Sequence, residues 1–77
     1  MEEKYKNAFR ESLSLDNKTN IEKLEYNQIP EWDSIGHMTL IADLEEKFDI
    51  SFDTDDIVNF SSYKKGKEIL KKLGINF

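Results

Sequence analysis

The chain has 77 residues, a formal net charge of −5 and no cysteine. Its acidic charge excludes nucleic acid as a partner, because phosphate binding needs a basic surface, and the lack of cysteine excludes disulfide bonds, thiolate zinc sites and a cysteine nucleophile. This length predicts a single domain, residues 1–77, whose core is too thin for a deep catalytic pocket, so it argues against an enzyme.

The first predicted element is a helix from about Glu2 to Leu15. Turn-forming residues at 16–20 then end the helical pattern. The large apolar residues of this helix recur at i, i+4 and i+8 and would line one face: Tyr5, Phe9 and Leu13.

The next segment, 21–33, is the least regular part of the chain. Pro30 disfavours helical structure at the residue before it, Ile29. The segment is nevertheless rich in large apolar side chains, which we expect to pack across the helices: Ile21, Leu24, Tyr26, Ile29 and Trp32.

The second helix is predicted to begin at Asp33 or Ser34, which are both good N-cap residues, and to end near Phe48. It has two apolar stripes, although a helix in a bundle needs only one. The stripe that we expect to face the core consists of Leu40, Ile41, Leu44 and Phe48. The second stripe is either additional core or an exposed binding surface, and it consists of Ile35, Met38 and Ala42.

A short third helix is expected to run from Thr54, as its cap, through Phe60, with Ile57 and Phe60 turned inward. The polar residues Ser61 and Ser62 then separate it from a fourth helix.

That last helix would be capped by Ser61 or Ser62 and would end near Leu73, with Gly74 where a C-terminal glycine belongs. Its apolar positions recur at three- and four-residue steps: Tyr63, Gly66, Leu70 and Leu73. These elements predict an all-α protein, a four-helix bundle of three longer helices and one short one.

The charge is unevenly distributed along the second half of the chain. Between Asp43 and Asp56 seven acidic residues oppose one lysine, a net charge of −6, whereas five lysines oppose one glutamate between Lys64 and Lys72, a net charge of +4. The lysines are accounted for in part by the preference for cations near a helix C-terminus. The acidic block is dense enough to indicate a docking surface for basic partners.

Two possible chemical sites are rejected from the sequence. Asp33, Ser34 and His37 contain the residue types of a catalytic triad, but Ser34 and His37 are only three residues apart on one helix, and Asp33 is not placed to orient the far ring nitrogen. We interpret His37 as a surface histidine. The acidic segment 49–60 has Thr54 and Phe60 where a calcium-binding EF-hand loop needs glycine and glutamate.

Ser34 is the remaining candidate for chemistry. At a helix start, backbone N–H groups and the helix dipole favour a bound or attached phosphate. Considered alone, however, a serine at this position is most simply explained as an N-cap.

The residues around Ser34 resemble the signature of the acyl carrier protein family. In that family an Asp-Ser-Leu-type motif opens the second helix and is followed by an apolar run, Leu-Glu-Glu and Phe. The corresponding residues here are Asp33-Ser34-Ile35, then Leu44-Glu45-Glu46 and Phe48. Downstream, Ile50, the acidic turn 53–56, Phe60-Ser61-Ser62-Tyr63 and Leu70 also follow the family layout. The similarity extends from Trp32 to Leu73.

The resemblance implies a modified protein. Ser34 would be esterified with 4′-phosphopantetheine from coenzyme A by a phosphopantetheinyl transferase that uses magnesium, and Asp33 would belong to the motif that the transferase recognises. The thiol of the covalent arm would carry an acyl group as a thioester, and the chain itself would hold no metal and do no chemistry on that group.

The resemblance also implies the partners, which would be acyl-transferring or acyl-activating enzymes with basic docking surfaces. The carrier would be a monomer, a phosphoprotein that serves fatty acid biosynthesis or a specialised lipid, glycan or secondary-metabolite pathway. The docking surface would combine apolar and acidic residues of the second helix: Ile35, Met38, Ala42, Asp43, Glu45 and Glu46.

The sequence favours a cytoplasmic location. It has no cysteine, no N-terminal apolar segment and no apolar run near the roughly 20 residues that a membrane span needs.

The chain departs from fatty-acid-synthase carriers at two positions. Those carriers usually have acids two and five residues after the serine, where this chain has Gly36 and Thr39. The run 32–38 is more similar to stand-alone carriers of specialised pathways. A glycine at the place of Gly36 also occurs in D-alanyl carrier proteins, so an aminoacyl carrier stays an alternative, as does an unmodified helical protein-interaction module.

Overall fold

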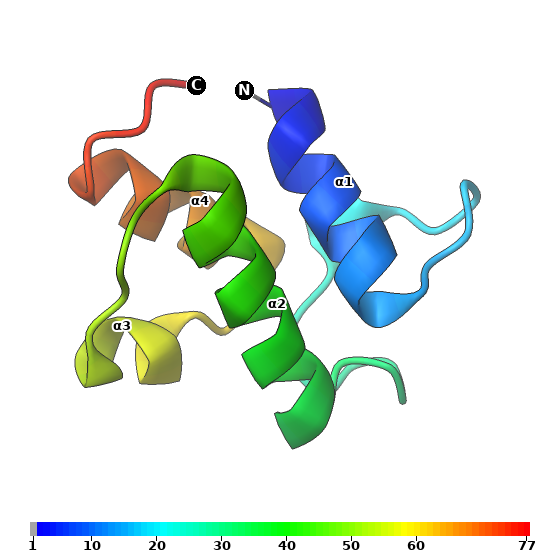
Figure 1. The fold of residues 1–77 in the computed structure, drawn as a ribbon. Helices are drawn as coiled ribbons and strands as arrows, with labels where there is room; N and C mark the ends of the chain where they lie inside the picture. Colours follow the sequence, from blue (N-terminus) through cyan, green and yellow to red (C-terminus); the bar gives the residue numbers. More distant parts are fainter. Residues whose placement is uncertain (1) are drawn as a thin grey trace.

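The computed structural model describes residues 2–77, which form α-helices joined by well-packed loops (Figure 1). In chain order the elements are α1 (Glu2–Leu13), the 3₁₀ turn η1 (Ile21–Lys23), α2 (Ser34–Phe48), α3 (Thr54–Asn59) and α4 (Tyr63–Lys72). The described residues contain no β-strand and only one isolated antiparallel bridge, between Glu25 and Ser62. The predicted all-α bundle of three longer helices and one short one is therefore confirmed.

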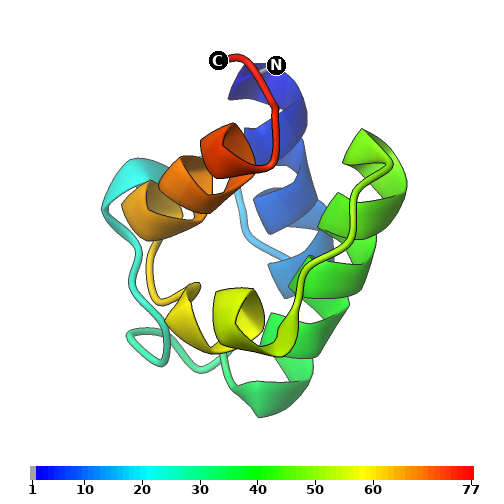
Figure 2. The same ribbon diagram turned by 90° about the vertical axis from the view of Figure 1, so that its left-hand side faces the viewer.

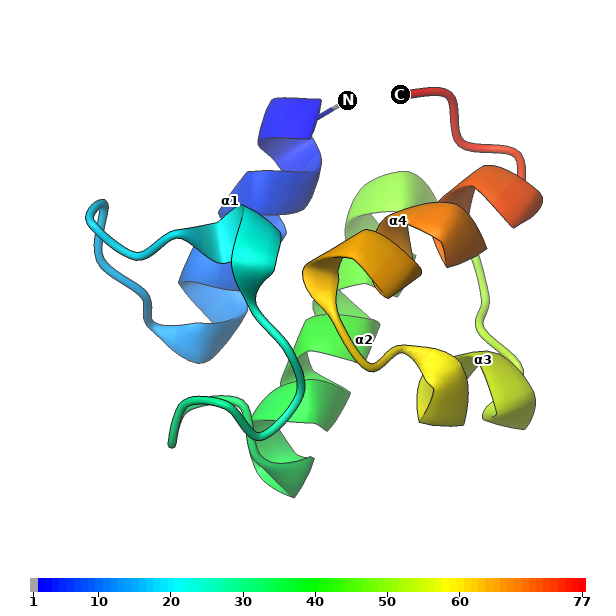
Figure 3. The ribbon, with the colours of Figure 1, turned by 180° about the vertical axis from the view of Figure 1, so that it is seen from behind.

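The helices α1 and α2 run antiparallel and pack side by side (Figure 1). The short helix α3 lies beside the start of α2, and α4 returns toward the end of the molecule at which α1 begins (Figure 2). Seen from behind, η1 lies against the first turn of α4 (Figure 3). No helix within residues 2–77 has the length and apolar character that crossing a membrane would require.

Aromatic side chains fill the centre of the bundle. The ring of Phe9 is central, because it contacts other rings at centroid distances of 5.1 to 6.1 Å. Those rings come from α1, from the loop before α2, from the α3–α4 junction and from α4, and they are Tyr5, Trp32, Phe60 and Tyr63. This single cluster joins the segments that are most distant in sequence.

The predicted inward faces are largely correct. The apolar residues expected on one face of α1 and the core stripe of α2 are buried. In the loop before α2, the predicted packing is confirmed for Ile21, Leu24 and Trp32, and Ile29 is partly buried. It is confirmed only in part for Tyr26, whose ring contacts Trp32 while the residue remains 39% exposed. Ile57 on α3 is only partly buried, whereas Phe60 is buried as expected.

Three helices end on a residue in the left-handed conformation. These residues are Ser14 (φ 54°), Asp49 (φ 54°) and Gly74 (φ 100°). In each case the next N–H donates to a carbonyl five residues earlier, at 2.9 to 3.1 Å, which is the Schellman arrangement. Ser14 therefore ends α1 at Leu13, two residues before the predicted end, and the expected role of Gly74 is confirmed.

The N-caps refine two predictions. Asp53, rather than Thr54, caps α3, because its Oδ1 accepts the Asp56 N–H at 2.8 Å. Ser62 caps α4 by accepting the Lys65 N–H at 2.9 Å. An aspartate just before the helix competes well with the threonine that follows it because its carboxylate is the stronger acceptor at the positive end of the dipole.

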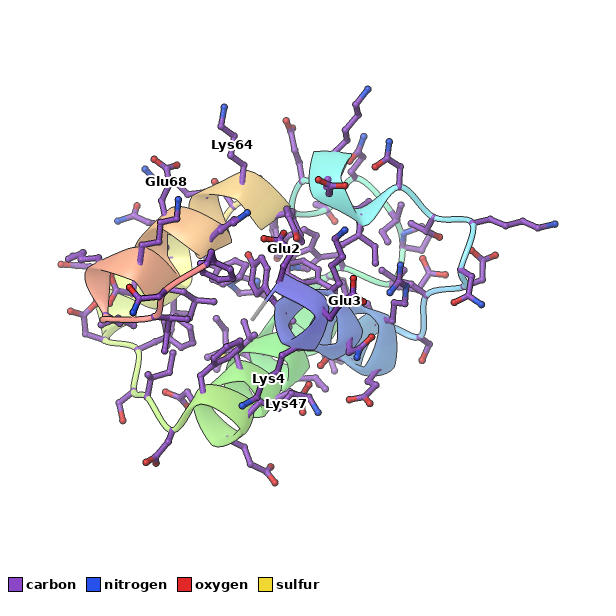
Figure 4. All side chains as sticks on the ribbon, turned by 90° about the horizontal axis from the view of Figure 1, so that it is seen from above. Glu2, Glu3, Lys4, Lys47, Lys64 and Glu68 are labelled. Carbon is purple, nitrogen blue, oxygen red and sulfur yellow. The ribbon has the colours of Figure 1, made fainter. Side chains whose placement is uncertain are left out.

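A contact between Glu2 and α4 links the two ends of the chain (Figure 4). The Tyr63 hydroxyl donates to the Glu2 carboxylate, and Lys67 forms an ion pair with it. The Lys67 and Tyr63 contacts lower the pKa of Glu2 below its ordinary value of 4.5. The folded state therefore favours the ionised carboxylate.

We predict that Glu2→Gln lowers the free energy of unfolding at pH 7 by less than about 1 kcal/mol, because the pair is partly exposed. A lowered folded pKa contributes stability above pH 4.5 that is lost as the pH falls through the folded pKa. The difference between wild type and variant, measured by urea unfolding, should therefore shrink at pH 3. Glu3→Gln, at an exposed neighbouring position, is the control for charge alone. A difference that does not change with pH would contradict this assignment.

Candidate functional site

In the first turn of α2, the N-cap and the candidate site of modification are two different residues. Asp33 is the N-cap, and its Oδ1 accepts the Gly36 N–H at 2.8 Å. Ser34 is the first residue of the helix and is exposed. The explanation of Ser34 as an N-cap is therefore wrong, because a carboxylate performs that function and leaves the serine hydroxyl available.

The Ser34 hydroxyl faces a tyrosine from the preceding loop. Its Oγ lies 3.4 Å from the hydroxyl oxygen of Tyr26. This distance exceeds that of a strong O–H···O hydrogen bond, so the contact is weak and both groups can bind other partners. Both side chains are exposed.

His37 is held by hydrogen bonds on both sides of its ring. Trp32 Nε1–H donates to His37 Nδ1 at 3.0 Å, and His37 Nε2 lies 2.8 Å from the Ile57 carbonyl oxygen. Because an indole only donates and a carbonyl only accepts, both bonds require the neutral ring with its proton on Nε2. The ring thus joins the loop before α2 to α3.

This arrangement excludes His37 as the base for Ser34 in this conformation. Neither ring nitrogen is directed at the serine, and Asp33 bonds to Gly36 rather than to the imidazole. The rejection of a triad stands. The interpretation of His37 as a plain surface residue is wrong, because the ring is half-buried and bridges two segments. The signal was its spacing of five residues from Trp32, whose indole needs an acceptor when buried.

Gly36 is required by packing. A Cβ atom at this position would lie 2.1 Å from the carbonyl oxygen of Glu31 and 3.0 Å from a methyl carbon of Leu13. Main chain cannot move aside as a flexible side chain can, so only glycine lets the loop approach the first turn of α2. The departure from the acidic residue of fatty-acid-synthase carriers thus has a structural cause in this chain.

An apolar groove opens beside this turn, with a volume of about 260 Å³. It is bounded by the loop before α2, by α2, by α3 and by the α3–α4 junction, and its lining residues are Tyr26, His37, Ile57, Val58, Phe60 and Ser61. Tyr26 thus borders both the groove and Ser34. Neither Tyr26 nor Val58 was predicted from the sequence to be a site residue.

The second apolar stripe of α2 is on the surface. Ile35 is 79% exposed, Met38 is 52% exposed, and Ala42 is exposed as well. The alternative that this stripe adds to the core is wrong. Val58 on α3 is also 73% exposed. With Ile57 and Phe60 turned toward the core, the helical period of α3 could have indicated that Val58 points outward.

The acidic residues predicted to lie beside this stripe differ in their exposure and in the contacts that they make within the protein. Asp43 lies 3.8 Å from Lys47 and accepts a hydrogen bond from Ser12 at 3.3 Å. Glu45 accepts the Phe52 N–H at 2.9 Å and so ties the α2–α3 loop to α2. Both are half-buried, whereas Glu46 is exposed. Of the three, Glu46 is the most accessible to a basic partner.

Another residue of the acidic block is not on the surface. Asp56 is buried, with 6% exposure, and its carboxylate lies 3.6 Å from Lys72 of α4. This pair links α3 to α4. Among residues 2–77, no group of three or more His, Cys, Asp or Glu side chains is arranged to hold a metal ion.

Comparison with known proteins places the chain in no family. It matches no protein-family model, no curated protein and no solved structure. A functional interpretation therefore rests on the geometry of the α2 start and on the sequence resemblance around Ser34.

We predict that His37→Ala lowers the free energy of unfolding by about 1–3 kcal/mol, because it leaves the buried Trp32 N–H without an acceptor. His37→Gln, which keeps a donor and an acceptor, should lose less. Urea unfolding followed by the fluorescence of Trp32, the only tryptophan, measures both. If the free energy of unfolding of His37→Ala stays within about 0.5 kcal/mol of the wild-type value, as is typical of surface positions, the hydrogen bonds of His37 do not stabilise the fold.

Proposed function

We propose that this protein is an acyl carrier, which holds an intermediate as a thioester on a 4′-phosphopantetheine arm esterified to Ser34. The observation that supports the proposal is the exposed hydroxyl of Ser34, the first residue of α2. Because Asp33 caps the helix, this hydroxyl is not used as a cap. The run around it resembles the carrier signature. The arm would supply the thiol that this cysteine-free chain lacks.

The residues around Ser34 fit a phosphodiester. The first turn of α2 directs backbone N–H groups and the positive end of the helix dipole toward this position. The carboxylate of the preceding residue, Asp33, is engaged by the Gly36 N–H. The Tyr26 hydroxyl can donate to an anion attached at Ser34.

The loading reaction would be catalysed by a phosphopantetheinyl transferase with magnesium. A bond would form between Ser34 Oγ and the phosphorus that bears the pantetheine, the phosphoanhydride bond of coenzyme A would break, adenosine 3′,5′-bisphosphate would leave, and the serine proton would pass to a base of the transferase. The carrier itself would do no chemistry on the cargo. Such a protein would be loaded in the cytoplasm, where coenzyme A is present.

The partner surface that we propose is the exposed stripe Ile35, Met38 and Ala42, with Glu46 as the accessible acid beside it. Partners would be acyl-transferring or acyl-activating enzymes whose docking surfaces combine an apolar patch with basic residues. Asp43 and Glu45 would contribute mainly by holding α2 and its loop in place.

Two alternatives remain proposals. An aminoacyl carrier would use the same arm, but the presence of Gly36 does not favour it, because the contact with Glu31 already requires glycine. An unmodified interaction module is favoured by the exposed apolar stripe of α2, which would bind partners without any arm.

Loading of Ser34 tests the carrier function directly. After incubation with coenzyme A, magnesium and a promiscuous phosphopantetheinyl transferase, the intact mass of the wild type should rise by one phosphopantetheine group. Ser34→Ala should show no gain, and Ser51→Ala, at another exposed serine, should load as the wild type does. No gain in the folded wild type with two different transferases would contradict the carrier function and favour the interaction module.

A charge placed on the exposed stripe of α2 tests the proposed docking surface. Met38→Glu should lower kcat/KM for loading about tenfold or more, because it places a charge in the centre of the apolar stripe. Asn7→Glu, at an exposed position of α1, adds the same charge elsewhere and should leave loading unchanged. Unfolding curves should show that both variants are folded. An unchanged kcat/KM for Met38→Glu would show that Met38 is not part of the docking surface.

A further inference from the structure

Tyr26 occupies an unusual place for a large aromatic residue. It is 39% exposed and lies in the loop between η1 and α2, outside any helix. The chain nevertheless brings its hydroxyl within 3.4 Å of Ser34 Oγ, eight residues later.

The position of Tyr26 is determined by contacts on several sides. Its N–H donates to the Ser61 carbonyl at 2.8 Å, which attaches the loop to the α3–α4 junction. Its ring packs edge-on against His37, with centroids 5.1 Å apart, and against Trp32 at 6.2 Å. His37 and Trp32 are themselves joined by a hydrogen bond. The tyrosine is thus held in place before any ligand arrives, which lowers the entropic cost of using it.

Tyr26 also borders both Ser34 and the apolar groove. Its hydroxyl lies 3.4 Å from Ser34 Oγ, and the residue lines the groove together with Ile57 and Val58 of α3. A chain attached at Ser34 can therefore enter the groove by passing the tyrosine. The groove, at about 260 Å³, is large enough for part of an arm or of a short cargo.

We propose that Tyr26 is a positioning residue for the arm: its hydroxyl donates a hydrogen bond to the phosphodiester on Ser34, and its ring directs the attached chain into the groove. This inference rests on the proposed carrier function. A phenol is neutral, so this bond does not require a second charged group to lose its water. Hydrogen bonds to an ionised acceptor are about twice as strong as those between neutral groups.

The test uses the loaded protein. Wild type, Tyr26→Phe and Tyr26→Ala are converted to the phosphopantetheine form, and intact mass confirms loading of each. The ³¹P signal reports the phosphodiester, and the shift differences between unloaded and loaded protein at the amides of Val58 and Ser61 report the groove. Urea unfolding checks that each variant is folded.

The two substitutions separate the two parts of the proposal. Tyr26→Phe should shift the ³¹P signal away from the wild-type position while the groove amides still respond to loading, because the ring is kept. Tyr26→Ala should change the ³¹P signal and also abolish the response at Val58 and Ser61.

The overturning results are equally distinct. A ³¹P signal identical in wild type and Tyr26→Phe would refute the hydrogen bond, and wild-type groove amides that do not respond to loading would refute the direction of the arm. Either result with a loaded wild type leaves the carrier function intact. A wild type that cannot be loaded overturns the carrier function itself, and the role of Tyr26 with it.

Discussion

The hydrogen-bonded series Trp32–His37–Ile57 is the constraint on which the arrangement of the site depends. A fully buried indole donates to a half-buried imidazole, which in turn donates to a carbonyl of α3. These bonds attach the loop before α2 and the short helix α3 to the first turn of α2. Because α3 has only six residues, it has little stability of its own and depends on such contacts for its position. The groove between these segments, and the place of Tyr26 beside Ser34, follow from this series.

The start of α2 combines helix capping, close packing of the main chain and an exposed hydroxyl within four residues. Asp33 caps the helix, Gly36 admits the main chain of Glu31, and Ser34 between them is left exposed. The residues that could have competed for the serine are engaged elsewhere, since the Asp33 carboxylate bonds to Gly36 and both nitrogens of His37 are occupied. A hydroxyl without an adjacent base is a poor nucleophile by itself. The carrier function that we propose needs no such base in this chain, because the transferase would supply it.

The acidic character of the chain has more than one physical role. Asp53 and Asp33 cap helices, Asp56 is buried against Lys72, and Glu45 holds the loop after α2. Of these four acids only Asp56 is buried, whereas Asp33 and Asp53 remain exposed. Recognition at this face would depend chiefly on the exposed apolar stripe, with charge supplying orientation and association rate. The lysines of α4 are also divided, because Lys67 pairs with Glu2 while Lys64 points away from the bundle (Figure 4).

The sequence by itself determined the helices and most of their inward faces, because helical periodicity and capping preferences act over a few residues. Ser34 was singled out instead by the resemblance of the run around it to the carrier signature. The helix ends before Asp49 and Gly74 were predictable, whereas the end of α1 before Ser14 was not, since a positive φ is uncommon for a residue such as serine. Only the tertiary structure decided that Asp33 is the cap, that the stripe from Ile35 is exposed, and that Tyr26 and the groove adjoin Ser34. Most of these features join segments that are distant in sequence, or depend on which groups are already paired. Local pattern contains no information on either, because both are set by how the helices and loops pack together.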